Sequence, residues 1–410
     1  KIHEIRRVHP DPRQINLVVK ALKDSAQPII IAGGGVLYSE AESELSKFAK
    51  KHNIPVTSTV MGIGCMDRDD PYYISTIGCL GDGSSNSLSK DCDIALAIGT
   101  KLSDFTTGSW TNFQNQNFKL ASVNTSRFDT TKHRALPVVS DAKIGLMDIS
   151  KELGDWKAPD QWYQRALKEK KEWDNYINKQ SGPTNQETPS YAHTVGAIYR
   201  KAETSDIVVT AAGGLVGETV QIWKPKQINT FETEWGFSCM GYEISGALGI
   251  KMANPNKEVI SFVGDGSYLL NNTDIYSSVI TKNKLIIIVC DNGGFAVINR
   301  LQLFKGGNEY NNLLKSSNTP GLVDVDFAKH AESMGAKSEH VNSISDLEEA
   351  FKRAKKSDVT YVISIKTHAY QWLEGSAFWD SPTLEIPTTD ENKEALKLYK
   401  EGKNKQRQGV

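Results

Sequence analysis

Cysteine is scarce in this sequence, and no two cysteines stand at the spacing of a metal-binding pair. Five cysteines in 410 residues argue against a disulfide framework and indicate free thiols in a reducing cytoplasm. No apolar run approaches the roughly 20 residues that a membrane-spanning helix needs. An excess of one charge is also missing, because 48 Lys and Arg balance 49 Asp and Glu. We therefore expect a cytoplasmic protein whose partners are neither nucleic acids nor membranes.

Apolar runs that alternate with amphipathic segments predict an α/β protein with two doubly wound parallel sheets. We expect a Rossmann-like domain over residues 1–150 and a second domain over residues 190–380. A charged, helical linker over 151–189 joins them, and a polar tail follows over 381–410. Buried strands are predicted at residues 27–32, 55–60, 93–99, 118–124, 206–211, 259–263, 285–290 and 360–366. Helices are predicted at residues 11–23, 39–52, 191–203, 240–252, 272–281, 326–334 and 345–355.

Gly33-Gly34-Gly35 follows the first predicted strand and could cradle a nucleotide phosphate. The dinucleotide-binding pattern is incomplete, because position 38 is Tyr rather than Gly. No acidic residue clearly ends the second predicted strand to hold a ribose. A nicotinamide dehydrogenase built on this loop is therefore the weakest of the hypotheses, and titration with NAD would test it.

Two polar loops in the second predicted domain each follow a strongly apolar run. Residues 259–263 precede Gly264-Asp265-Gly266-Ser267, and residues 285–290 precede Asp291-Asn292. Because neighbouring parallel strands end at the same edge of a sheet, Asp265 and Asn292 can reach one metal ion. Their oxygens, a backbone carbonyl at Gly294 and diphosphate oxygens are ligands that suit Mg²⁺.

The glycines of this pattern allow close approach of phosphate to the backbone, and amides near Ser267 would face the anion. A second Gly-Asp-Gly, at residues 81–83, follows no β-rich run, so we interpret it as an unrelated turn. Another glycine loop, Gly213-Gly214, lies at a strand-to-helix junction and suits an oxyanion.

The paired loops at Asp265 and Asn292 resemble the thiamine diphosphate (ThDP) fingerprint of acetolactate synthases, pyruvate decarboxylases and their relatives. The likeness extends upstream over residues 237–249. It implies that Met240 wedges between the two rings of ThDP and that the Ser238 carbonyl holds the pyrimidine amino group. The implied cofactors are ThDP and Mg²⁺. The cofactor-binding residues implied in this way are Gly213, Gly214, Ser238, Met240, Gly264, Gly266, Ser267 and Asn292.

Three segments look like a narrower group, the trihydroxycyclohexane-1,2-dione hydrolases of myo-inositol catabolism. These segments are residues 234–243, 291–302 and 306–313, and the likeness runs to about residue 379. Gly293 departs from it, because a larger polar or basic residue is expected there. The resemblance implies a carbon–carbon hydrolase that opens the cyclic dione to an aldehyde acid, 5-deoxyglucuronate. Candidate substrate-contacting residues are Asn299, Arg300, Gln302 and His368, of which His368 could transfer protons near neutral pH.

In this superfamily the glutamate that activates ThDP lies in a separate pyrimidine-binding domain. The resemblance implies that this domain is absent from these 410 residues and comes from an upstream region or another subunit. We expect a homodimer or homotetramer, since such sites lie between subunits. Two alternatives stay open: an acetolactate synthase-like enzyme or 2-oxoacid decarboxylase, and a non-catalytic ThDP-binding module without the activating glutamate.

Overall fold

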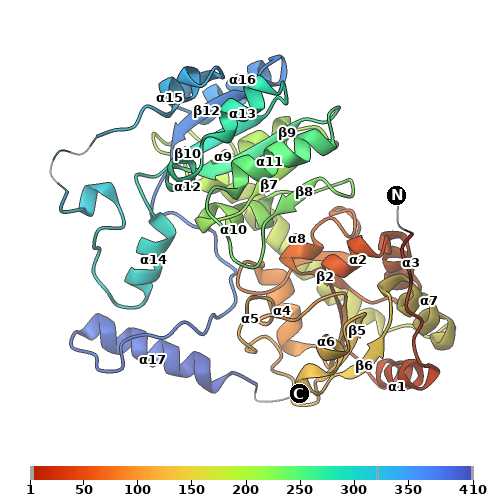
Figure 1. Ribbon diagram of the computed structural model, residues 1–410. Coiled ribbons are helices and arrows are strands. Elements are labelled where there is room, and N and C mark those ends of the chain that lie inside the picture. The colour runs from red at the N-terminus through yellow and green to blue at the C-terminus, as the bar shows by residue number, and fades with distance from the viewer. Residues whose placement is uncertain (1–3, 320, 322, 408–410) are drawn as a thin grey trace.

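The computed structural model describes residues 4–319, 321 and 323–407, which form two α/β units lying side by side (Figure 1). Within these residues the strands form two six-stranded sheets. Every strand pair within the two sheets is parallel. Helices cover both faces of each sheet, so the predicted fold class of two doubly wound parallel sheets is confirmed.

The first sheet has the order β3-β2-β1-β4-β5-β6. Its strands are β1 (Pro28–Ala32), β2 (Val56–Ser58), β3 (Tyr73–Thr76), β4 (Ile94–Ile98), β5 (Lys119–Asn124) and β6 (Leu136–Val139). Its helices are α1 (Pro12–Lys23), α2 (Gly34–Tyr38), α3 (Glu42–His52), α4 (Gly83–Asp91), α5 (Asp104–Thr107), α6 (Arg127–Thr131) and α7 (Ala142–Leu153), with 3₁₀ turns η1 (Val60–Gly62) and η2 (Lys132–Arg134). The central strands β1 and β4 are buried along their whole length because α1, α3 and α7 cover one face and α4 covers the other.

Helix boundaries in the first unit follow from local capping. Asp11 caps α1 by accepting the N–H of Arg13, and Pro12 occupies the first turn, where its missing N–H costs nothing. The helix predicted from residue 39 starts only at Glu42, because Ser39 ends the short helix α2. This part of the prediction is wrong, since the glycine loop begins a separate helix instead of a turn.

The glycines at residues 33–35 are explained by close packing within the first unit. A Cβ on Gly33 would lie 2.4 Å from the carbonyl oxygen of Gly99, and one on Gly35 would lie 2.6 Å from the Gly99 Cα. The second Gly-Asp-Gly is likewise structural, since Asp82 caps α4 by accepting the N–H of Ser85. Both motifs therefore have a packing or capping role.

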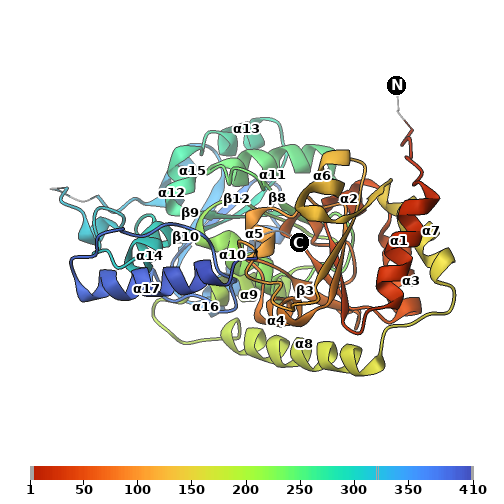
Figure 2. The ribbon, with the colours of Figure 1, turned by 90° about the horizontal axis from the view of Figure 1, so that it is seen from below.

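Helix α8 (Asp160–Gln180) joins the two units and lies within the charged stretch at residues 151–189. Its first turns pack on the first unit, where the Trp162 indole donates to the carbonyl of Pro28 at 2.9 Å. Its last turn places Ile177 in the core of the second unit. Figure 2 shows this helix running along one side of the molecule.

The second sheet has the order β11-β12-β10-β9-β7-β8. Its strands are β7 (Ile207–Thr210), β8 (Phe231–Thr233), β9 (Val259–Gly264), β10 (Ile286–Asp291), β11 (Lys337–Val341) and β12 (Tyr361–Lys366). One face is covered by α9 (Tyr191–Lys201), α10 (Gly213–Ile222) and α16 (Ile344–Lys355), and the other by α11 (Tyr242–Ala253), α12 (Asp265–Leu270), α13 (Asp274–Ile280) and α15 (Phe327–Ser333). Helix α14 (Ala296–Phe304) and the 3₁₀ turn η3 (Leu314–Ser316) project beside the sheet (Figure 1).

After β12 the chain returns to the first unit. Residues 367–380, here called the crossing segment, pass from the second unit to the first, where the N–H of Ala377 donates to the carbonyl of Gly78 at 3.2 Å. Helix α17 (Asp390–Asn404) lies in the polar tail. Arg407 then binds the first unit through a 2.7 Å hydrogen bond from its guanidinium to the carbonyl of Asn115. Among the described residues, no helix combines the length and apolar character needed to cross a membrane.

Candidate active site

The predicted metal loops lie at the carboxyl edge of the second sheet, where β9 and β10 end side by side. The two strands pair in parallel, with Cys290 opposite Gly264. Asp291 and Asp265 immediately follow these two positions. Strand β9 ends because Gly264 is the N-cap of α12, whose first residue is Asp265. The structure therefore brings together the two loops that the sequence pattern had paired.

Asp265 is buried beside a second carboxylate. It is only 6% exposed, and its Oδ2 accepts the N–H of Gly294 at 2.7 Å. Burial and the adjacent charge of Asp291 raise the pKa of Asp265. Lys366 lies 2.6 Å from Asp291 Oδ2 and balances one of the two acids. The remaining negative charge suits a divalent cation at this edge.

Asn292 holds a buried oxygen that has no hydrogen-bond partner. Its Nδ2 donates to the hydroxyl of Tyr191, which fixes the orientation of the amide. Its Oδ1 is buried and finds no partner among the residues described here. A buried amide oxygen without a partner is costly unless a ligand satisfies it. Asn292 Oδ1 can therefore complete a metal site with Asp265 and the backbone at Gly294.

Gly266 lies against the side chains of Phe295 and Met240, where its lack of a side chain leaves the backbone accessible. A Cβ at this position would lie 2.7 Å from the Phe295 ring and 3.4 Å from the Met240 methyl group. Met240, the predicted wedge, thus lies directly beside the Gly-Asp-Gly loop. This proximity connects two parts of the sequence pattern, Met240 and Gly266, that are 26 positions apart.

The loop that carries Met240 is exposed and held from one side. Ser238 has a left-handed φ of 50°. The Glu234 carboxylate accepts the N–H of Phe237 at 3.2 Å and that of Cys239 at 2.7 Å. Phe237 is 90% exposed and Met240 38% exposed. The loop therefore presents apolar side chains outward from a fixed backbone.

Gly213 and Gly214 open α10 at the end of β7. Gly213 has a left-handed φ of 74°, and a Cβ there would meet only Val297, 4.0 Å away. A Cβ on Gly214 would instead collide with the Trp372 ring at 2.0 Å. Free amides in the first turn of a helix favour anions. The turn is therefore open to a ligand at Gly213 and covered by the crossing segment at Gly214.

Arg300 lies on α14 with its guanidinium 5.1 Å from the centre of the Trp372 ring. Glu218, one turn into α10, is close enough for its charge to interact with Arg300. The carboxyl group of Glu218 is buried, its Oε1 accepts the N–H of Leu373 at 2.9 Å, and its Oε2 has no partner among the described residues. Burial raises the pKa of Glu218 to about 7.

A chain of hydrogen bonds links Asn299 to His368 through Glu309 and Tyr370. Asn299 is fully buried, and its Nδ2 donates to Glu309 at 2.9 Å. The Tyr370 hydroxyl donates to the same Glu309 oxygen. The Tyr370 N–H in turn donates to His368 Nδ1 at 3.0 Å. Asn299 precedes Arg300 in α14, so the helix that carries Arg300 also holds one end of this chain of hydrogen bonds.

Sequence reasoning missed three residues of this region. Tyr191 and Glu218 are placed here by α9 and α10, and no motif marks either of them. Glu243 is 1% exposed, and its carboxylate accepts the N–H of Ala212 at 3.1 Å and that of Gly241 at 2.9 Å. One signal for Glu243 is present in the sequence: an acidic residue directly follows the Met-Gly-Tyr stretch at the start of an apolar helix. An acid that is buried in such a helix requires hydrogen-bond partners.

The residues at this edge fit a metal-bound diphosphate. They supply a carboxylate, an unpaired amide oxygen, a backbone without side chains at Gly266 and an open left-handed turn at Gly213. Among the described residues, no three His, Cys, Asp or Glu side chains gather as a metal-binding group. Amide, carbonyl and phosphate oxygens are ligands that could complete the coordination of a metal at Asp265.

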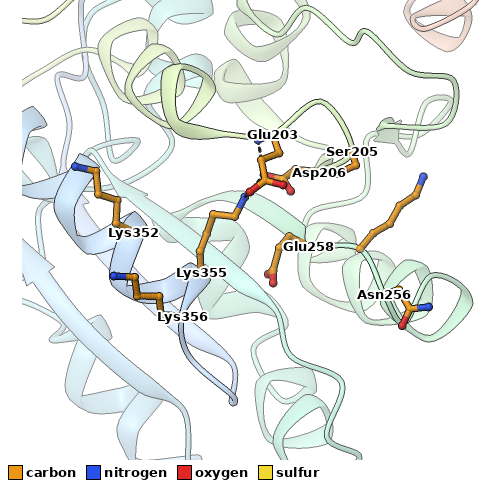
Figure 3. Close-up of a pocket in the computed structure, with 9 residues that line it drawn as sticks. Glu203, Ser205, Asp206, Asn256, Glu258, Lys352, Lys355 and Lys356 are labelled. Carbon is orange, nitrogen blue, oxygen red and sulfur yellow. Dashed lines mark hydrogen bonds and ion pairs between the residues drawn. The ribbon is translucent and has the colours of Figure 1, made fainter.

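A surface pocket lies elsewhere, near residues that precede β7 and β9 and that end α16 (Figure 3). Its central cation, Lys355, lies 2.9 Å from Asp206 and 3.0 Å from Glu203. The lysine is thus paired within the chain, and these ion pairs tie α16 to the start of β7. The pocket lies at the edge of the sheet opposite to Asp265.

Two known families match parts of the chain. Residues 15–149 match the family described as thiamine pyrophosphate enzyme, central domain. Residues 211–365 match the family described as thiamine pyrophosphate enzyme, C-terminal TPP binding domain.

Similar curated proteins carry the name 3D-(3,5/4)-trihydroxycyclohexane-1,2-dione hydrolase. One from Clostridium tetani (strain Massachusetts / E88) is 34% identical over 409 residues, which covers 92% of this chain and 64% of the relative. One from Geobacillus thermodenitrificans (strain NG80-2) is 32% identical over 426 residues, covering 95% and 65%. One from Bacillus anthracis is 32% identical over 409 residues, covering 92% and 64%. The chain thus spans just under two thirds of the length of these relatives.

Proposed function

We propose that the chain, which matches the central domain and the C-terminal TPP binding domain of thiamine pyrophosphate enzymes, forms part of a ThDP- and Mg²⁺-dependent carbon–carbon hydrolase. We propose trihydroxycyclohexane-1,2-dione as substrate and 5-deoxyglucuronate as product, in inositol catabolism in the cytoplasm. The printed names of the relatives support this substrate. The observation that carries the cofactor assignment is the unpaired buried oxygen of Asn292, in the loop whose Gly294 N–H binds the Asp265 carboxylate.

In this proposal Asp265, Asn292 and the Gly294 carbonyl hold Mg²⁺. The turns at Gly213 and Gly264–Gly266 bind the diphosphate through backbone amides, and Ser267 lies at the start of the same helix. Met240 supports the rings, and the carbonyl of Ser238 accepts a hydrogen bond from the pyrimidine. When bound, ThDP supplies a carbon nucleophile for the substrate carbonyl and stabilises the negative charge left as the neighbouring bond breaks.

The side chains beyond the diphosphate turn have properties suited to a polyhydroxylated ring. Arg300 carries several N–H donors for a carbonyl or hydroxyl oxygen, and Trp372 offers an aromatic face beside it. Asn299 fixes Glu309, and His368 is linked to the same group through Tyr370. We assign substrate orientation to Arg300 and Asn299 and proton transfer to His368.

The proposal includes a pyrimidine-binding domain, from another region of the protein or from a second subunit, in a homodimer or homotetramer. The exposed loop around Phe237 and Met240 supports it, because apolar side chains at a cofactor site are normally covered. Trihydroxycyclohexane-1,2-dione, ThDP and Mg²⁺ are then the small-molecule partners.

Turnover of trihydroxycyclohexane-1,2-dione by the full-length protein, with and without ThDP and Mg²⁺, tests the proposal. We expect acid release that requires both, with ¹⁸O from labelled water in the new carboxylate. Consumption of pyruvate without turnover of the dione would assign the site to acetolactate synthesis or 2-oxoacid decarboxylation. Binding of ThDP without turnover of either compound would indicate a non-catalytic module.

A further inference from the structure

Two helices at the candidate site begin without side-chain caps of their own. Ala212 is the N-cap of α10 and Gly241 is the N-cap of α11, and neither supplies a side-chain hydrogen bond to its helix. The segments next to these caps are those assigned to the cofactor, Gly213-Gly214 on one side and Met240 on the other. An uncapped helix start usually frays, because its first N–H groups lack partners. A cofactor site built on two such starts needs another means of fixing them.

Glu243 supplies that means from the second position of α11. One carboxylate oxygen accepts the N–H of Gly241 at 2.9 Å, as the acidic residue of a capping box does. The other accepts the N–H of Ala212 at 3.1 Å, in a different helix. The side chain is almost wholly buried, and the Ser261 hydroxyl donates to the Glu243 carbonyl at 2.7 Å. A single carboxylate therefore binds the N-caps of two helices that follow different strands.

Strand β9, which leads into the Gly-Asp-Gly loop, contacts the backbone of the same residue through the Ser261 hydroxyl. Burial raises the pKa of Glu243, and the hydrogen bonds from Ala212 and Gly241 oppose that rise. The turn after β7 and the loop before α11 thus meet at one carboxylate.

We propose that Glu243 is a positioning residue that sets the distance between the diphosphate turn at Gly213 and the ring-supporting Met240. The inference rests on the proposed cofactor, ThDP. Glu243 is not expected to touch the cofactor, because both carboxylate oxygens are engaged with backbone amides. We therefore expect Glu243 to affect the affinity only of a ligand that contacts both the Gly213 turn and Met240.

The test compares two ligands that differ in how many of these segments they touch. Magnesium pyrophosphate requires only the diphosphate turn and the metal loops, whereas Mg²⁺–ThDP also requires Met240. In the full-length protein, we expect E243Q to weaken ThDP binding at least tenfold and pyrophosphate binding less than threefold by calorimetry. At saturating ThDP, kcat should fall less than fivefold. The unfolding midpoint without ligand should fall modestly, because Gln has one acceptor oxygen for the two N–H groups.

Glu258 offers a matched control. It lies just before β9, at the end of the strand opposite to Asp265, and it pairs with Lys284 at 3.0 Å. E258Q should leave both ligand affinities unchanged. If E243Q does not fold, E243D tests the same idea, since its shorter side chain can reach Gly241 within α11 but no longer Ala212. Equal weakening of both ligands, or unchanged ThDP affinity, would overturn the positioning role. Failure of the wild type to bind ThDP would instead refute the proposed function.

Discussion

Replacement of Glu218 by Gln should change how the stability of the protein depends on pH. The carboxyl group is fully enclosed between α10 and the crossing segment, where it accepts one N–H, from Leu373, and its second oxygen has no partner among the described residues. Burial raises its pKa from 4.5 to about 7. Gln has the same shape, keeps an oxygen for the N–H of Leu373 and does not titrate. The substitution therefore removes the titration while preserving the packing.

The sign and size of the effect follow from proton linkage. Between pH 4.5 and 7 the folded state holds a proton on Glu218 that the unfolded state has released. Unfolding is then favoured by rising pH, so Glu218 makes the protein less stable as pH increases through this range. At 1.36 kcal/mol per pKa unit, the difference corresponds to about 3 kcal/mol. The free energy of unfolding of E218Q should thus gain about 3 kcal/mol relative to the wild type between pH 4.5 and 7.5.

Urea denaturation of the cofactor-free protein, followed by tryptophan fluorescence at several pH values from 4.5 to 8, measures this difference. The exposed residue Glu374 lies in the same crossing segment, and E374Q is the control that should run parallel to the wild type. Parallel curves for E218Q and the wild type would refute the reasoning, as would a relative gain for E218Q as the pH is lowered.

Three further predictions concern the site and the interface between the units. D265N should lose the stabilisation that ThDP and Mg²⁺ give the wild type, which is about 2.7 kcal/mol at one hundred times Kd; a preserved thermal shift would argue against a metal role for Asp265. Y191F removes the hydroxyl that orients the Asn292 amide, and Mg²⁺ affinity should fall roughly tenfold, as for other residues that orient metal ligands; unchanged affinity in a magnesium titration would contradict this. R68M removes the guanidinium that pairs with the fully buried Asp82 carboxylate and should reduce the free energy of unfolding by about 3–5 kcal/mol. In urea denaturation, the double variant R68M/D82N should recover part of this loss.

The fold was predictable where strands are covered on both faces. Strands such as β4 and β10 are continuous apolar runs, and the sequence indicates them because burial on both faces requires that composition. The four strands that were not predicted are β3, β6, β8 and β11, and each of them forms an edge of its sheet. An edge strand pairs on one side only and tolerates polar residues or proline, as in Lys-Ser-Glu-His-Val of β11 and Pro137 of β6.

The site was predictable to the extent that its parts are local in sequence. Asp265 and Asn292 each follow a recognisable strand, so their meeting at one edge follows from parallel pairing. The contacts of Glu243 with Ala212 and of Tyr191 with Asn292 join positions 31 and 101 residues apart. No spacing rule encodes such contacts, because they arise only when separate helices pack on the finished sheet.

The return of Arg407 to the first unit has a consequence for synthesis on the ribosome. The backbone that it binds, at Asn115, lies 292 positions earlier in the chain. Domains generally fold as their residues emerge, so the first sheet can form long before its last covering residue exists. The Arg407 guanidinium lies over the Phe118 ring at 5.4 Å. This ring is therefore not covered by Arg407 while the second unit is being translated. Attachment of Arg407 therefore follows the synthesis of the whole second unit.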